Sequence, residues 1–471
     1  MRCWPPNSPT APTGRRRESS RCHTMPANSA DTPAMPGWHE VRAGMERVTE
    51  AIAHELAQPV AQPPPWGALE WRLAMAMATA HGVAPLLSAY PGWPHGCWQT
   101  YLAGQRMHVE ARHQRLLAQL EAIDSLARER GIPLVPLKGA ALHALDVYAP
   151  GERPMADLDL LIDPADESRV GDLLQRLGYE LSMVVWKHRV YRIPQAFEPS
   201  TLGEHRDAAI TIEVHTSIQE RLPMHVVDLS SRVRGAAQVP GINAYASVGA
   251  LLCHLLLHLA GNMCTRTVRL IHVHDISRLA ALLQPHDWDV LLEAHRTLAD
   301  WWAVPPLRLV ERYFAGAVPR RVLDALEPRC PRRLRPLTTG AALTRLSCSA
   351  VWPAAFPGWR WTRSTGEAMA YVSSRLHPDA EARRERKAML RTQAWLQDHS
   401  AHASMVSRAW SLLAHTTPRA DTRHLVRLAF GAASPQASGE QLEVQGLESS
   451  RGKVGVFDDR AALRGNRQTQ A

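Results

Sequence analysis

The chain has very little lysine, since only four of its 54 basic residues are lysines and the rest are arginines. This preference, together with abundant alanine, indicates a GC-rich, bacterial-type genome and says little about function. Aromatic residues make up 6% of the chain and charged residues 21%, whereas 45% of the residues are apolar. This composition excludes a wholly disordered chain and is typical of a globular protein. At 471 residues the chain is long enough for two or three domains.

Paired cysteines, a secretory signal and a long apolar run are also missing. The seven cysteines include no CxxC pair, which argues against a disulfide framework and favours a reducing, cytoplasmic location. The N-terminus, MRCWPPNSPT, has no apolar core, and Met25, Met35 or Met45 could be the real start. The longest apolar stretch, LLCHLLLHLAG, is too short to span a bilayer, so no membrane partner is expected.

The positive charge is concentrated in one segment. The net charge of the chain is +9, and residues 301–400 contain 17 Lys and Arg against 8 Asp and Glu, an excess of +9. A basic segment can attract phosphate or an anionic surface. The simpler interpretation is a solvated helical face rich in arginine, and the sequence leaves the role of this segment open.

Composition and periodicity divide the chain. Residues 1–45 and 434–471 are polar and without pattern, and both are expected to be disordered. Residues 46–129 are predicted to be helical, ending in a long helix at about 101–129. One face of this helix is predicted to consist of Leu116, Leu120, Ile123 and Ala127.

The period changes after residue 130. IPLVPL, DLDLLI, VVWKHRVYRI and AAITIEVHTSI are predicted strands, and GAALHALDVY and PADESRVGDLLQRLGYEL are predicted helices. The order β-α-β-α-β-β predicts a small mixed-sheet core of the α+β or α/β class at 130–220. From 245 to 400 the pattern is helical. The expected architecture is therefore this core, flanked by N-terminal helices and a C-terminal all-α domain.

Two aspartates open the strand DLDLLI. Asp157 and Asp159 are two positions apart, so their side chains project from the same face, with Cα atoms about 6.6 Å apart. Two neighbouring carboxylates repel each other unless a cation lies between them. Hard oxygen ligands suit Mg²⁺, which also binds substrate phosphates. The pair is therefore a candidate metal site.

A DxD pattern alone is weak. With 20 aspartates among 471 residues, roughly one such pair is expected by chance, and Asp287 and Asp289 form a second one. The second pair stands at the start of a helical pattern, where aspartate caps the helix and interacts favourably with its dipole. We therefore expect a structural role for the second pair.

Three neighbours distinguish the first pair. Lys138 and Gly139 form a strand-to-helix turn, where backbone amides attract phosphate. Arg153 precedes the pair and has a planar, multi-donor side chain suited to phosphate. Glu213 lies on the polar face of the strand ITIEVH and would add a third carboxylate. Lys138 and Arg153 could instead be ion-pair partners, Gly139 a plain turn glycine, and Glu213 a surface ion-pair group.

The stretch LVPLKGAALHALDVYAPGERPMADLDLLIDPADESRVGDLLQRLGYEL, followed by IEVH, resembles the uncharacterised nucleotidyltransferase family of the DNA polymerase β-like superfamily. The shared elements are LKGaaL, RPMxDxDLL, the helix ending in LGY, and the ExH strand. The resemblance is specific over about 130–216 and continues more weakly into HLLLHLAGNMCTRTVRLIHVHDISRL. The wider superfamily usually has Gly-Ser or Gly-Gly where this chain has Lys138 and Gly139, so Lys138 could contact phosphate itself.

The resemblance implies transfer of a nucleoside monophosphate from an NTP with Mg²⁺ or Mn²⁺. Asp157, Asp159 and Glu213 would bind metal and carry catalysis, while Lys138, Gly139 and Arg153 would bind the nucleotide. Three further residues are candidates for contact with the substrate or with the catalytic groups: His215, His258 and Asp275. Alternatively, these two histidines have only a structural role, and Asp275 is a polar group between packed helices. The histidine spacings also resemble a zinc site, but the chain has no HExxH motif.

The acceptor is left open by the sequence: a small molecule, peptide, protein or RNA would all fit, and so would different NTPs and oligomeric states. Two rival functions also remain. One is a nucleotide-sensing or partner-binding module without catalysis on the same fold. The other is a toxin-type transferase acting on RNA or protein, for which salt-sensitive RNA binding would be the sign.

Overall fold

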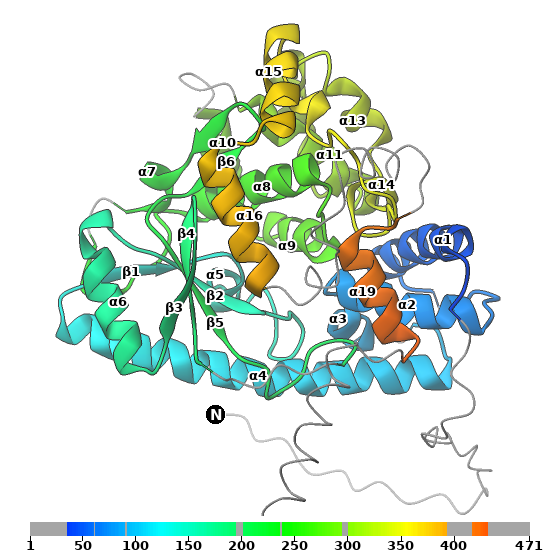
Figure 1. The fold of residues 1–471 in the computed structure, drawn as a ribbon, viewed down its shortest axis with the longest axis horizontal. Helices are drawn as coiled ribbons and strands as arrows, with labels where there is room; N and C mark the ends of the chain where they lie inside the picture. Colours follow the sequence, from blue (N-terminus) through cyan, green and yellow to red (C-terminus); the bar gives the residue numbers. More distant parts are fainter. Residues whose placement is uncertain are drawn as a thin grey trace, which may run out of the picture.

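The computed structural model describes residues 35–60, 62–89, 92–194, 201–235, 238–293, 300–392 and 417–431. The chain is mostly helical, with one six-stranded mixed sheet in its middle region followed by a helical C-terminal part (Figure 1). This architecture confirms the predicted fold class. The predicted disordered tail at 434–471, and residues 1–34 of the predicted N-terminal extension, lie outside the described residues.

Helices precede the sheet in the chain: α1 (Trp38–Ala57), α2 (Ala68–Ala80), α3 (Ala84–Ala89) and α4 (Gly96–Glu129). Helix α1 begins at Trp38, so the expectation of disorder up to residue 45 is wrong for its last eight residues. They are ordered because Val41 and Met45 are fully buried and belong to the same apolar cluster as residues of α2. The residues before Trp38 are polar, so the sequence pattern did not indicate that a helix begins there.

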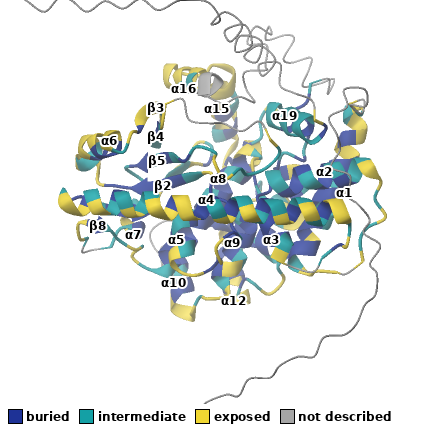
Figure 2. Cartoon of the chain, turned by 90° about the horizontal axis from the view of Figure 1, so that it is seen from below, coloured by how far each residue is buried: buried dark blue, intermediate teal, exposed yellow. Residues whose placement is uncertain are grey.

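Helix α4 has 34 residues and runs under both the sheet and the N-terminal helices (Figure 1). Figure 2 shows buried and exposed residues alternating along it. The predicted apolar face is confirmed, because Leu116, Ile123 and Ala127 are buried and Leu120 packs against them. The helix is longer than predicted, beginning at Gly96 instead of about residue 101.

The strand order of the sheet is β3-β4-β5-β2-β1-β8. The pairs β2–β5 and β1–β8 are parallel, and the other neighbours are antiparallel. The bounds are β1 (Pro133–Pro136), β2 (Asp157–Leu161), β3 (Glu180–Val185), β4 (His188–Arg192), β5 (Thr211–His215) and β8 (Gly241–Ile242). Strand β8 lies beyond the predicted core boundary at residue 220, because it returns to pair with β1.

The structure divides one of the predicted strands into two. VVWKHRVYRI spans the end of β3 and the whole of β4, which form an antiparallel hairpin in which Val185 pairs with His188. Trp186 and Lys187 make the turn. Two-residue hairpin turns usually contain glycine, asparagine or aspartate. Because this turn has none of them, the residue pattern did not reveal it.

Helices α4 and α6 (Glu167–Arg176), the second preceded by the short helix η1 (Pro164–Asp166), supply the residues packed on one face of the sheet. Their apolar residues form a cluster with Leu158, Leu160, Ile212 and Val214. Helix α5 (Lys138–Ala144) contacts β2 and α8 (Val248–Thr265). The polar face of β2 and β5 is therefore directed toward the helical part of the chain.

The C-terminal part begins with the hairpin β6 (Gln219–Arg221) and β7 (Val226–Asp228). Its helices are α7 (Ser230–Val233), α8, α9 (Leu270–Ala280), α10 (Pro285–Glu293), η3 (Trp301–Ala303), α11 (Val304–Tyr313), α12 (Arg320–Leu326), η4 (Glu327–Arg329), α13 (Arg335–Gly340), α14 (Leu343–Leu346), η5 (Trp359–Trp361), α15 (Thr365–Leu376), α16 (Ala380–Thr392) and α19 (Ala420–Ala429). Helix α19 lies beyond the predicted limit at residue 400 and contacts α2.

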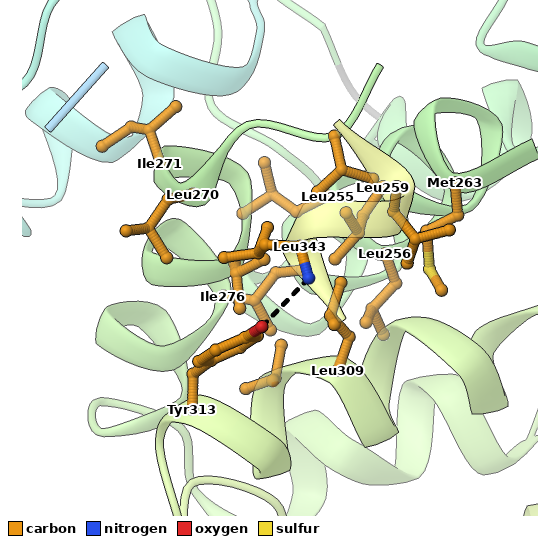
Figure 3. Close-up of a cluster of buried hydrophobic side chains, with 14 of the residues drawn as sticks. Leu255, Leu256, Leu259, Met263, Leu270, Ile271, Ile276, Leu309, Tyr313 and Leu343 are labelled. Carbon is orange, nitrogen blue, oxygen red and sulfur yellow. Dashed lines mark hydrogen bonds between the residues drawn. The ribbon is translucent and has the colours of Figure 1, made fainter. Parts of the chain in front are cut away.

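Helix α8 is the central helix of this part. It is long and apolar enough to cross a membrane by length and composition, but 78% of its residues are buried inside the protein. Figure 3 shows Leu256 and Met263 of α8 in one apolar cluster with Leu309 of α11. In the same cluster the backbone amide of Leu343 donates to the hydroxyl of Tyr313 at 2.9 Å. The apolar run thus belongs to a core helix.

Candidate active site

The register of β2 and β5 places the three predicted carboxylates together. Asp159 pairs with Glu213 in this parallel ladder, and Asp157 pairs with Thr211 one step earlier. Side chains alternate along a strand, so Asp157, Asp159 and Glu213 share a face, while the intervening leucines and isoleucine enter the core on the other face. The predicted alternation of both strands is confirmed.

Asp159 is buried between two cationic groups. The side chain is 5% exposed, and its Oδ1 accepts hydrogen bonds from Lys138 Nζ at 2.8 Å and from His215 Nε2 at 2.9 Å. Burial alone would raise the pKa of Asp159, but Lys138 and His215 hold that pKa well below its usual value. Asp159 is therefore an anion at neutral pH.

Asp157 lacks such compensation. Burial, followed by the charges of Asp159 and Glu213, raises the pKa of Asp157 to about 7, and Lys138 and Arg269 offset this only in part. The negative charge of Asp157 is thus not fully compensated by the neighbouring cations. A bound divalent cation would remove the imbalance, so the residues present fit a metal site of oxygen ligands.

Lys138 stands at the strand-to-helix turn in a strained conformation. Its φ is +48°, in the left-handed region that residues other than glycine adopt at a cost. Burial would lower the pKa of its ammonium, but Asp159, Glu213 and Asp157 together raise that pKa. Its backbone N–H donates to the hydroxyl of Tyr245 at 3.3 Å. The turn thus directs a permanent cation at the carboxylates.

Gly139 gives Arg153 room. A Cβ on Gly139 would lie 2.2 Å from Arg153 Nη1 and 2.8 Å from Met155 Sδ, distances that no real side chain tolerates. Both residues border the same pocket as Asp157. The absence of a side chain at Gly139 therefore determines how closely Arg153 approaches the turn.

Arg153 is held by a buried carboxylate from the helical part. Its Nε and Nη2 donate to the two oxygens of Asp275 at 2.8 and 2.7 Å, and Asp275 is 1% exposed. The hydroxyl of Tyr148 also donates to Asp275, at 2.9 Å. Of the two roles considered for Arg153, the geometry shows the ion-pair partner, and direct phosphate binding by Arg153 stays a prediction.

A pocket of about 140 Å³ lies between the sheet and the helices. The predicted residues that line it are Lys138, Gly139, Arg153, Asp157, Asp159, His258 and Asp275. Glu213 and His215 are outside this lining and stand beside Asp159 on β5. Arg269 and His272 of the helical part also line it. The sequence did not single out Arg269, and it drew attention to His272 only through the spacing of the histidines.

Arg269 is a cation of the pocket that pairs with no carboxylate of the described residues. Its Nε donates to the carbonyl of Ala80 at 2.9 Å, and within the described ranges no ion pair joins it to an acidic side chain. Burial lowers the pKa of its guanidinium, the expected effect on a charge that lacks a close partner. An arginine just before a predicted helix was visible in TVRLIHVHD, but nothing in the sequence placed it near Asp157.

The pocket histidines are neutral. Burial, then the charge of Lys138, holds the pKa of His258 well below its ordinary value, and burial together with Arg269 lowers the pKa of His272 to about 3. Their rings are in edge contact, with centroids 4.9 Å apart. Neutral imidazoles beside a cationic pocket can accept a hydrogen bond without adding charge.

A buried arginine fixes the positions of the strands that bear the carboxylates. Arg112 of α4 donates to the carbonyls of Met155 and Ala156, just before β2, and to those of Ala208 and Ala209, just before β5. The bond lengths are 2.7–3.0 Å. This long-range clamp, which sequence reasoning did not identify, sets the spacing of β2 and β5.

A mixed sheet with clustered carboxylates beside a cationic pocket belongs to the class of sites whose charges suit a metal ion and phosphate groups. Comparison with family models makes this class specific: the model described as an uncharacterised nucleotidyltransferase matches residues 67–314. The match covers more than half of the chain, which therefore belongs to this nucleotidyltransferase family. No curated protein and no solved structure matches the chain. The sheet, α4 and helices α8 to α11 lie within the matched range, whereas most of the basic segment follows it.

Proposed function

We propose that the protein transfers a nucleoside monophosphate from an NTP to a hydroxyl or phosphate acceptor, with a divalent cation such as Mg²⁺ or Mn²⁺. The observation that supports this most directly is the pairing of Asp159 with Glu213 and the position of Asp157 on the same face. A divalent cation held there would neutralise charge on the α-phosphate and on the leaving pyrophosphate.

The reaction forms one bond and breaks another. An acceptor oxygen attacks the α-phosphorus, and the bond from this phosphorus to the bridging oxygen breaks. Pyrophosphate leaves with the electron pair. Where the acceptor is a hydroxyl, Glu213 accepts its proton, whereas an ionised phosphate acceptor has no proton to give. Glu213 suits this role because it lies next to Asp159 in the sheet while its side chain remains outside the pocket lining.

The cations of the pocket would hold the phosphates. Lys138 lies 2.8 Å from Asp159, and Arg269 enters the same pocket from the helical part. Arginine and lysine bind phosphate through charge-assisted hydrogen bonds. The cavity of about 140 Å³ is smaller than the roughly 300–1,000 Å³ typical of sites that enclose whole ligands. It would therefore hold phosphate groups, while the base lies outside it.

Transfer is tested by incubating the full chain with Mg²⁺ or Mn²⁺, each α-labelled NTP in turn, and a cell extract. We expect label in a product in the presence of metal and loss of labelling on chelation. The variant carrying Asp157→Asn and Asp159→Asn should give none. Labelling that persists in this variant would refute the proposed mechanism.

The same assay addresses the rivals. Metal-dependent NTP binding without any labelled product would favour the nucleotide-sensing module.

Label in RNA or protein, together with salt-sensitive RNA binding, would favour the toxin-type transferase. Several arginines of the basic segment are already paired, for example Arg308 with Glu327 and Arg363 with Glu367. The segment therefore gives that second rival no specific support.

A further inference from the structure

Two imidazoles face Glu213 from neighbouring strands. His188 of β4 pairs with His215 of β5, and Glu213 precedes His215 by two positions, so it projects on the same side. His188 Nε2 lies 3.4 Å and His215 Nε2 lies 3.7 Å from the same oxygen of Glu213, Oε2. One donor atom from each of the three residues falls within 4.8 Å of the others.

These separations match those between ligands of a small tetrahedral ion. Zinc binds nitrogen and oxygen ligands at about 2.0–2.2 Å, and in a tetrahedron such bonds place neighbouring ligand atoms roughly 3.3–3.6 Å apart. The observed separations of 3.4 and 3.7 Å are close to this range. An ion could therefore enter between the three groups with only small side-chain shifts.

We propose that His188, Glu213 and His215 form a binding site for a divalent transition metal ion of the Zn²⁺ type, beside the Asp157 and Asp159 pair. Imidazole nitrogen favours such ions, whereas Mg²⁺ takes oxygen ligands. Two histidines and one glutamate leave the fourth tetrahedral position open for water or a substrate oxygen.

The surroundings of His188 support the site. Its side chain is 12% exposed, and its Nδ1 is buried without a hydrogen-bond partner in the described part of the chain. The contact of its Nε2 with Glu213 is long for a hydrogen bond. A buried polar ring with such weak partners is costly, and a metal bond to Nε2 would compensate for part of that cost.

Binding exchanges one interaction for another at His215. Its Nε2 now donates to Asp159, and this hydrogen bond would be replaced by the metal bond. Asp159 keeps the ammonium of Lys138 at 2.8 Å, so it is not left without a partner. The site shares Glu213 with the proposed transfer reaction, but metal binding is measured without nucleotide, so the two proposals are tested separately.

The test titrates the metal-free full chain with Zn²⁺ in competition with a chromophoric chelator. We expect one tight Zn²⁺ site per chain that excess Mg²⁺ does not occupy. His188→Ala and the more conservative His188→Gln should each weaken binding at least about tenfold. His286→Ala, which removes a histidine that is 79% exposed, should bind as the wild type does. Equal affinity of wild type and His188→Gln would overturn the proposal.

X-ray absorption of the Zn²⁺-loaded wild type gives a readout that needs no variant. Two imidazoles and oxygen ligands are expected around the ion, and a spectrum dominated by sulfur or by oxygen alone would refute the site. Transfer with Mg²⁺ alone is measured separately. A chain that binds Zn²⁺ without transferring nucleotide contradicts only the proposed function, whereas one that transfers without binding Zn²⁺ contradicts only this site.

Discussion

The chain contains the Asp-x-Asp pattern at two described places, in opposite settings. Asp157 and Asp159 begin a central strand of the sheet, where Asp159 is almost completely buried. Asp287 and Asp289 lie in helix α10. Asp287 Oδ2 accepts from the backbone N–H of Gln284 at 2.9 Å, and Asp289 pairs with Arg321 at 2.8 Å near the surface.

The difference lies in how each negative charge is satisfied. In α10 Asp287 has a partner at the start of its own helix, and Asp289 pairs with Arg321 of α12, where solvent reaches both side chains. In the sheet, Glu213 lies beside Asp159, which is buried, and Asp157, which is partly buried, and adds a third carboxylate to them. The Asp-x-Asp pattern is the same in the sheet and in α10. The charges of the neighbouring side chains decide whether the pattern attracts a cation.

The largest expected contrast is in activity. Replacing Asp157 and Asp159 by asparagine should lower the single-turnover rate of nucleotide transfer at least about a thousandfold, because the charge that binds the cation is lost. The matched variant at Asp287 and Asp289 should stay within about twofold of wild type, since asparagine also caps helices. Similar losses in both variants would contradict the distinction drawn between the two pairs.

The second contrast is between a buried and an exposed ion pair. Asp275→Ala leaves Arg153 buried without its carboxylate, and should lower the free energy of unfolding by about 3–5 kcal/mol. Asp289→Ala breaks a pair that is nearly half exposed and should cost at most about 1 kcal/mol. Urea denaturation of both variants measures the difference. Equal costs would mean that the Arg153 pair does not stabilise the junction of the sheet and the helices.

The third contrast concerns the cations. Arg269→Gln should raise KM for the NTP by about 10- to 100-fold, because a charge-assisted hydrogen bond contributes about 1.5–3 kcal/mol. Arg320→Gln, which changes a side chain that is 80% exposed, should leave KM unchanged. Steady-state kinetics with pyrophosphate as a competing ligand checks both. An unchanged KM in Arg269→Gln would remove Arg269 from the phosphate site.

The smallest expected effect is on the free energy of unfolding of the metal-free protein. The pKa of Asp157 is about 7 in the folded protein and near 4 when unfolded, so the folded state binds the proton more tightly. The stability contributed by this proton is present below about pH 4 and is lost as the pH rises to about 7. Asp157→Asn should therefore exceed wild type at pH 8 by about 1–3 kcal/mol and match it near pH 4.

Urea unfolding in the presence of a chelator measures this effect, with Asp289→Asn as the control that should show no such dependence. A pH-independent difference between Asp157→Asn and wild type would argue against an uncompensated charge at Asp157. Added divalent cation should reverse the order of the two proteins at pH 8, because wild type alone keeps all its ligands.

Local patterns determined much of the fold. The period-two alternation of DLDLLI and ITIEVH predicted which side chains share a face, and the structure has that arrangement. The apolar face of α4 was equally visible, because residues three and four apart lie on one side of a helix. The hairpin of β3 and β4 was missed, since its turn contains Trp186 and Lys187 instead of typical turn residues.

The sequence by itself determined that Asp157 and Asp159 project together and that Glu213 lies on the polar face of its strand, because strand geometry is local. Only the tertiary structure decided which groups surround them. Arg153 meets Asp275 across 122 positions of the chain, and Arg269 and His188 approach the carboxylates from a different helix and a different strand. Such contacts depend on how packed helices and paired strands cross, and no short stretch of residues specifies that.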